Sequence, residues 1–201
     1  MDNLLLNDKG IAMLTVILLM LVLTVLGISA ITVTGLENRM AGFAMRTEAA
    51  TTAAESCLGT GVNIIQQTID PGSLPAAFLS NATPAGPVPA TNSTVLNDEI
   101  LGRPENNPDT PYGSGAVPNM VFTVNNYNVT GDIDRLFQKA KAGSGMQMHA
   151  GHDGVGTGAS SGGTDIYYRV DCVAANTATG TVARVSAVYV CTMTNGESCQ
   201  K

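Results

Sequence analysis

The amino-acid sequence predicts an α+β fold, in which one long N-terminal helix packs on a small antiparallel β-sheet that carries long loops. Three observations support this prediction. Residues 11–36 form an uncharged apolar run, and helical spacing of apolar side chains continues beyond it to residue 65. Two segments in which apolar and polar residues alternate, 166–174 and 181–191, indicate strands near the C-terminus.

The overall composition excludes two classes of protein. The chain has 201 residues, with 10 Lys and Arg against 16 Asp and Glu, and a formal net charge of -6. Only 13% of the residues are charged and 44% are hydrophobic. A basic nucleic-acid-binding domain and a charge-rich disordered chain are therefore excluded, and we expect no nucleic-acid contact. The length fits one domain with one appended segment.

The apolar run is long enough to cross a membrane. Residues 11–36 contain no Asp, Glu, Lys, Arg or His. A helix needs roughly 20 apolar residues to span a hydrocarbon core about 30 Å thick. The run exceeds the apolar core of an ordinary secretory signal, so we expect a retained single-pass helix rather than one removed by signal peptidase.

The helical pattern continues beyond the apolar run. Apolar or small residues recur there at spacings of three and four, which is the period of one helix face. They are Leu36, Met40, Phe43, Thr47, Ala50, Ala54, Leu58, Val62 and Ile65. The next strong helix breaker is the Asp-Pro-Gly sequence at residues 70–72. We therefore expect one helix from near Ile11 to near Gln67, whose amphipathic part, residues 37–69, packs on a head formed by residues 70–201.

Two loop-rich segments divide the head. All nine prolines lie between residues 71 and 118, so the segment 70–118 is predicted to be a loop and not a continuous helix or central strand. Glycine is concentrated in residues 143–163, where ordering the backbone is entropically expensive. We expect an exposed, mobile loop there.

The remaining parts of the head are predicted to form a small core. Residues 121–129 have a strand-like composition, and residues 132–142 place apolar side chains at helical spacing, which predicts a short amphipathic helix. Residues 166–191 are predicted to form a β-hairpin that turns over residues 175–180. The sheet is expected to pack on the helix stripe between Leu36 and Ile65.

The four cysteines indicate an oxidising compartment. Cys57, Cys172, Cys191 and Cys199 all follow the apolar run, and they allow three disulfide connectivities. Asn-Gly at residues 195–196 is a strong two-residue turn signal that brings Cys191 close to Cys199. We therefore favour pairing of Cys191 with Cys199, which leaves Cys57 to join Cys172 and to link the helix to the sheet.

The sequence offers few candidates for chemistry. His149, His152 and Asp153 are weak candidates for a metal site in the glycine-rich loop, and no CxxC spacing supports a zinc site. Asp98 and Glu99, with two carboxylates further along the proline-rich segment, are assigned to a solvated acidic face. No motif pairs a nucleophile with a base, so we expect neither an enzyme nor a bound cofactor or metal.

Several short motifs carry a resemblance to a known family. Lys-Gly-Ile at residues 9–11, before the apolar run, resembles a prepilin peptidase site. Three further elements resemble the N-terminal region of PilX-type minor pilins of the type IV pilus, and two near the C-terminus are similar to the closing strands of that family. They are LTVLG at 23–27, ENRMAG at 37–42, AAES at 53–56, YYRV at 167–170 and ARVSAVYV at 183–190.

The resemblance implies a processing site, a location and partners. Residues 1–10 would be a leader removed after Gly10, and the new amino terminus on Ile11 would be methylated. The chain would stay in the inner membrane as a single-pass protein with its head in the periplasm, and would later join a pilus at the cell surface. Its partners would be prepilin peptidase, the inner-membrane assembly platform, and the other minor pilins and major pilin through the N-terminal helix.

One position departs from the pattern of major pilins. Those proteins carry Glu at the fifth mature position, where it neutralises the amino terminus of a neighbour, whereas counting from Ile11 reaches Thr15. Among pilin-like proteins this is expected of a subunit with few neighbours. We therefore expect a minor pilin at or near the tip, which initiates, caps or functionalises the pilus, for example in adhesion or aggregation.

Two other functions remain open on sequence grounds. The chain could be an unprocessed single-span membrane protein whose periplasmic head binds a ligand, or a metal through His149 and His152. It could also be a tip pseudopilin of a type II secretion system. An intact leader on the mature protein would favour the first of these alternatives.

Overall fold

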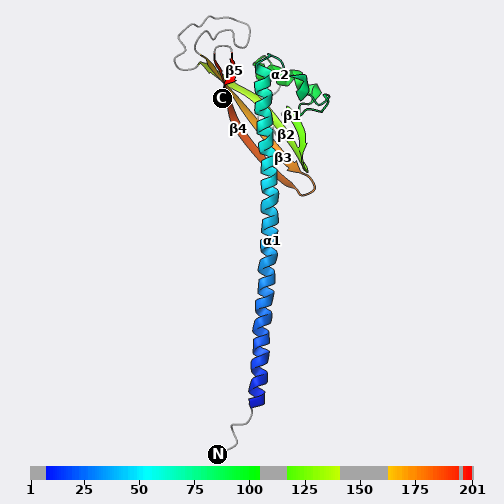
Figure 1. Cartoon of the computed structure of the whole chain (residues 1–201), viewed down its shortest axis with the longest axis vertical. Coiled ribbons are helices and arrows are strands. Elements are labelled where there is room, and N and C mark those ends of the chain that lie inside the picture. Colours follow the sequence, from blue (N-terminus) through cyan, green and yellow to red (C-terminus); the bar gives the residue numbers. More distant parts are fainter. Residues whose placement is uncertain (1–7, 105–116, 141–162, 195–196, 201) are drawn as a thin grey trace, which may run out of the picture. The chain divides into compact units, whose positions relative to one another are not determined.

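The computed structural model describes residues 8–104, 117–140, 163–194 and 197–200 (Figure 1). The chain divides into two compact units, Met1–Arg46 and Thr47–Lys201, and each is described by itself. The predicted divisions after residues 10, 36 and 69 remain predictions.

Helix α1, Asp8–Ile69, begins in the first unit and ends in the second. No proline interrupts it, and it ends one residue before the predicted breaker. The amide of Gly72 donates to the carbonyl of Ile69 at 3.2 Å, and Gly72 has a φ of 68°, a left-handed conformation that favours glycine at a helix end. The long N-terminal helix predicted from the sequence is thus confirmed.

The second unit contains a five-stranded antiparallel sheet whose strands follow in chain order. They are β1 Met120–Val124, β2 Tyr127–Ala140, β3 Thr164–Asn176, β4 Thr181–Thr194 and β5 Glu197–Gln200. The predicted hairpin is β3 and β4, and both strands extend beyond the predicted ends. Gly180 has a φ of 67° at their turn, where Asn176 accepts hydrogen bonds from the amides of Ala178 and Thr179.

The short helix predicted at residues 132–142 is wrong, because this segment belongs to β2. The strand pairs with β3 from Asn128 to Ala140, and the pairing shifts between Arg135 and Phe137. A β-bulge inserts an extra residue at such a shift and breaks the period of two. The spacing of three between Ile133 and Leu136 is compatible with a helix, but Ile133 is buried and Leu136 is exposed, and the long-range ladder to β3 determines the backbone.

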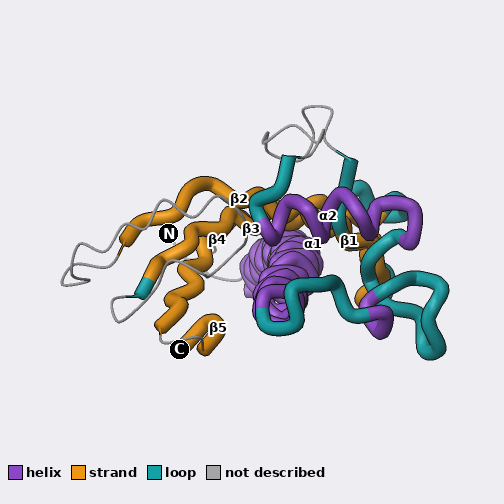
Figure 2. The backbone as a smooth tube through the Cα atoms, turned by 90° about the horizontal axis from the view of Figure 1, so that it is seen from above, coloured by secondary structure: helices purple, strands orange, loops and turns teal. Residues whose placement is uncertain are grey.

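The core of the second unit lies between the sheet and the last part of α1, which Figure 2 shows end-on beside the strands. Small residues on α1 allow a close approach, and the first of the buried ones is Ala50. A Cβ added at Gly61 would lie 2.9 Å from Val170 Cγ1, and one at Gly131 would lie 2.5 Å from Cys57 Sγ. A larger residue at either position would therefore force a neighbouring side chain to shift.

The part of the predicted contact stripe that lies in the second unit is buried or half-buried from Ala50 onward, while its part from Leu36 to Phe43 belongs to the first unit and stays a prediction. Leu36, Met40 and Phe43 are 61% to 69% exposed, whereas Ala50 and Ile65 are fully buried. The side chains that share the sheet's core thus begin at Ala50. The helical spacing shows which side chains lie on one face of the helix. It does not show over what length the sheet covers that face.

The proline-rich segment contains a helix that the sequence analysis missed. Helix α2, Ser93–Leu101, lies in a proline-free stretch and ends at Gly102, whose φ is 69°. Two short 3-10 helices precede it, η1 Ala76–Phe78 and η2 Ala90–Asn92. The buried hydroxyl of Tyr168 on β3 donates to the carbonyl of Ile100 at 2.7 Å and ties α2 to the sheet, and burial raises the pKa of this tyrosine.

Candidate functional site: the exposed apolar helix

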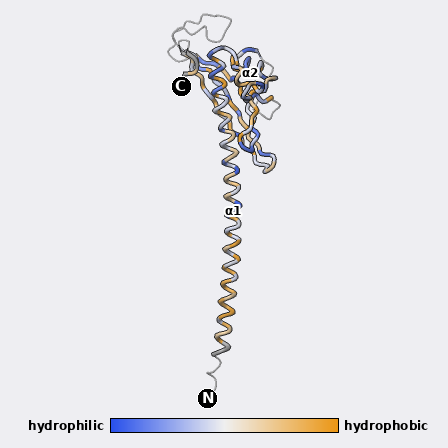
Figure 3. The backbone as a smooth tube through the Cα atoms, turned by 45° about the vertical axis from the view of Figure 1, so that its right-hand side comes forward, coloured by the Kyte–Doolittle hydropathy of each residue, from blue (hydrophilic) through white to orange (hydrophobic). Residues whose placement is uncertain are grey.

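The first unit exposes a long apolar surface on all sides of α1. Twenty large apolar side chains between Ile11 and Met45 each have 45% to 75% of their surface exposed, and no residue from Ile11 to Arg46 is buried. Figure 3 shows the hydrophobic colouring along this part of the helix. Burying such a side chain is worth about 1.5 to 3 kcal/mol, so this surface requires lipid or other protein around it.

The hydroxyl groups within the apolar run are satisfied by the helix itself. Each donates to a backbone carbonyl three or four residues earlier, at 2.8 to 2.9 Å. The donors are Thr15, Thr24, Ser29, Thr32 and Thr34. These side chains need no water, which is the condition for polar groups in a hydrocarbon environment.

Within the described residues, α1 is long and apolar enough to cross a membrane, with a hydropathy of 2.9 in its most apolar window. This statement about the helix rests on its length and its amino-acid composition. Together with the exposed apolar surface and the self-satisfied hydroxyls, it agrees with the predicted membrane-spanning part of the helix.

Two shallow depressions mark the surface of α1 at small residues. Gly35 lies in the first and Gly42 in the second, and a Cβ added to either would have no atom within 4 Å. Asn38 lines both. Small residues allow the backbones of two helices to approach closely. The ENRMAG element thus borders a surface that can receive another helix, a property that the sequence analysis did not identify.

The proposed processing junction lies at the start of α1. Gly10 and Ile11 are both helical, and the side chain of Ile11 is exposed. Thr15 lies about one turn further along and donates to the carbonyl of Ala12 at 2.8 Å.

Two disulfides stabilise the second unit, with the pairing that the sequence analysis favoured. Cys57 on α1 joins Cys172 on β3 across a sequence separation of 115 residues, and Cys191 on β4 joins Cys199 on β5 across 8. All four residues are buried. The first bridge fixes the helix to the sheet, and the second fixes the last strand to its neighbour.

The candidates for other chemistry are not assembled into a site. Among the residues that the structure describes, no group of three or more His, Cys, Asp or Glu could hold a metal ion. His149, His152 and Asp153 lie outside those residues. Asp98 forms a 3.5 Å ion pair with Arg103, but Glu99 is only 3% exposed, so its assignment to a solvated acidic face is wrong. It lies on the buried side of α2, which the sequence analysis had not recognised as a helix.

The comparisons with known proteins identify the N-terminal region. Residues 9–58 match the family model described as PilX N-terminal. No curated protein and no solved structure matches the chain. The matched range covers the proposed processing junction, the exposed apolar helix and Cys57. Residues 9–58 therefore form a PilX N-terminal domain, which is the domain of a type IV minor pilin family.

Proposed function

We propose that prepilin peptidase cuts this chain between Gly10 and Ile11 and that Ile11 is then methylated. The mature protein helps to initiate, cap or functionalise a type IV pilus, at or near the tip of that pilus. The observation that carries the proposal is the exposed apolar surface of α1 between Ile11 and Met45. The role is structural, as is general for pilins, and involves no catalysis.

One surface then serves two environments. In the inner membrane, lipid covers the apolar side chains, and in the filament the helices of the major pilin and other minor pilins cover them. The depressions at Gly35 and Gly42 favour the second state, because neighbouring helices can come close there. The two disulfides agree with a head that folds in the periplasm before the assembly platform extracts the subunit.

The first test is mass spectrometry of the N-terminal peptide from native membranes and from sheared filaments. We expect a mature amino terminus at a methylated Ile11 in both samples. An intact leader starting at Met1 would contradict the proposal and would favour a single-span membrane protein with a ligand-binding head.

The position at the tip is argued from Thr15. Its hydroxyl is satisfied by the carbonyl of Ala12, so the fifth mature position carries no charge and no unsatisfied polar group. A carboxylate in the middle of an apolar span costs about 2.5 to 3.5 kcal/mol unless it is paired. A subunit without this carboxylate cannot neutralise the amino terminus of a neighbour, which suits a position with fewer neighbours.

Thr15→Glu is expected to increase the number of copies per filament, because the variant can pair with a neighbouring amino terminus along the shaft. Thr24→Glu is the matched control, since Thr24 makes the same type of hydrogen bond, to Leu21 at 2.8 Å, but lies away from the amino terminus. Quantitative immunolabelling of sheared filaments measures the copy number. An unchanged count for Thr15→Glu, or an equal increase in the control, would contradict the tip assignment.

A further inference from the structure

The sheet carries a buried cluster of three carboxylates. Asp132 and Asp134 belong to β2 and Asp171 belongs to β3, and each is at most 1% exposed. Asp132 and Asp171 are direct partners in the antiparallel ladder. Alternate residues of a strand point to opposite faces, and Cys172 bonds to α1, so the neighbouring Asp171 points to the face away from that helix.

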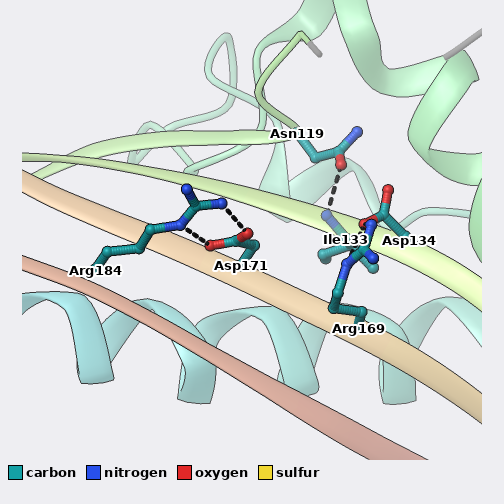
Figure 4. A network of polar contacts seen from close by, with 6 residues as sticks. All are labelled: Asn119, Ile133, Asp134, Arg169, Asp171 and Arg184. Atoms are coloured by element: carbon teal, nitrogen blue, oxygen red, sulfur yellow. Dashed lines mark hydrogen bonds and ion pairs between the residues drawn. The ribbon is translucent and has the colours of Figure 1, made fainter. Parts of the chain in front are cut away.

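Two of these carboxylates are paired with arginine, as Figure 4 shows. Arg169 donates from Nε to Oδ2 of Asp134 at 2.9 Å, and Arg184 donates from Nε to Oδ1 of Asp171 at 2.9 Å. A second guanidinium nitrogen of each arginine also contacts its aspartate. The hydrogen bond to Asp171 raises the pKa of Arg184, so this arginine stays charged.

The third carboxylate has no such partner. Both side-chain oxygens of Asp132 are buried, and within the described part of the chain no side chain donates a hydrogen bond to them. The nearby Asn119, which precedes β1, accepts from the amide of Ile133 at 2.8 Å, while its own buried Nδ2 has no hydrogen-bond partner among the residues that the structure describes. An isolated ionised carboxylate is too costly to bury without compensation, and such a group instead takes up a proton.

The surrounding charges do not compensate Asp132. The charged groups that act on Asp132 are Asp134 on its own strand and Asp171 and Arg169 on β3, while Arg184 on β4 pairs with Asp171. On α2, which packs against β2, Glu99 is also buried. With all three carboxylates ionised, the two arginines would leave the cluster with one net negative charge inside the protein.

We propose that Asp132 holds a proton in the folded protein, and that its ionisation makes the second unit lose conformational stability as the pH rises toward neutrality. Burial raises the pKa of Asp132 from 3.8 to about 7, with further increases from Asp134 and Asp171 and smaller opposing effects of Arg169 and of the backbone amide of Ile133. Between these two pKa values the folded state binds more protons than the unfolded state. Stability is therefore highest at acidic pH, falls between about pH 4 and pH 7, and is level above pH 7.

The test is urea unfolding of the full-length protein in detergent micelles at pH 5 and pH 8, followed by tyrosine fluorescence. We expect the folding equilibrium constant to fall roughly a hundredfold between the two pH values, because one linked proton changes it by up to tenfold per pH unit. Asp132→Asn should abolish most of this dependence and should be more stable than the original protein at pH 8. Asp98→Asn is the control and should retain the dependence.

A stability that is constant or rises from pH 5 to pH 8 would overturn the proposal, as would an Asp132→Asn variant with the full pH dependence. If Asp132→Asn does not fold, the protonation of the buried carboxyl group can still be measured in the original protein. Its carboxyl groups can be titrated by carbon-13 NMR or by the infrared band of protonated carboxyl groups. We expect one carboxyl group to titrate near pH 7, and the absence of any that titrates above pH 6 would overturn the proposal.

Discussion

Gly10→Leu is expected to leave the chain at full length in the membrane and absent from filaments. The peptidase must accommodate the residue before the cut, and a bulky side chain there would block it. The retained residues 1–10 include Asp2 and Asp8, and they would have to be accommodated beside apolar helices in the filament. Immunoblotting of membrane and sheared-filament fractions, with mass spectrometry of the N-terminal peptide, measures both effects.

The matched control for this prediction is Gly35→Leu, the same substitution within one of the depressions on α1. It should be processed normally, because the peptidase site is intact, but should enter filaments less well because leucine fills the depression. Normal processing of Gly10→Leu would show that another site or another enzyme forms the amino terminus. Loss of processing in Gly35→Leu would show that these two variants cannot separate cleavage by the peptidase from entry into filaments.

The long helix and the β3–β4 hairpin could be predicted because their signals are local. The apolar run and the first breaker after it fix the ends of α1 to within a few residues. The alternating residues and the turn around Gly180 fix the hairpin. Each signal lies within the element that it predicts, so no knowledge of the rest of the fold was needed.

The two failures have different physical causes. The apolar spacing in residues 132–142 resembles that of a helix, and only the pairing of β2 with β3 shows that the segment is a strand. Proline density concealed α2, although its own nine residues contain none. For β2, the helical spacing was interpreted without the partner strand that determines the backbone. For α2, the rule that proline excludes a helix was applied to a segment much longer than the helix.

The proposed processing junction and the carboxylate cluster differ in how much of each could be predicted from the sequence. The proposed processing junction and Thr15 came from a resemblance, and the structure adds that the helix behind them exposes its apolar surface on all sides. The carboxylate cluster was not found at all. Asp132 and Asp171 are far apart in the sequence and become direct neighbours only through the register of β2 and β3.

Replacing Cys57 and Cys172 together with alanine is expected to lower the free energy of unfolding of the second unit by about 4 to 5 kcal/mol, because a cross-link over a loop of roughly 100 residues removes that much unfolded-state entropy. The separation here is 115 residues. The total stability of a domain is about 5 to 15 kcal/mol, so this loss brings the unit close to unfolding. Urea unfolding under non-reducing conditions measures the change.

The matched control replaces Cys191 and Cys199 with alanine, because this pair closes a separation of only 8 residues. The same entropic relation gives a loss of about 2.5 kcal/mol for so short a loop. The two bridges also differ in what they hold, since one joins α1 to the sheet and the other joins only β5 to β4.

Equal losses for the two pairs would contradict the loop-length argument, and so would an original protein whose unfolding is unaffected by reductant. A loss for Cys57 and Cys172 well above the about 4 to 5 kcal/mol of the loop-length relation would mean that docking of α1 on the sheet depends on a covalent link as well as on the close packing at Gly61 and Gly131.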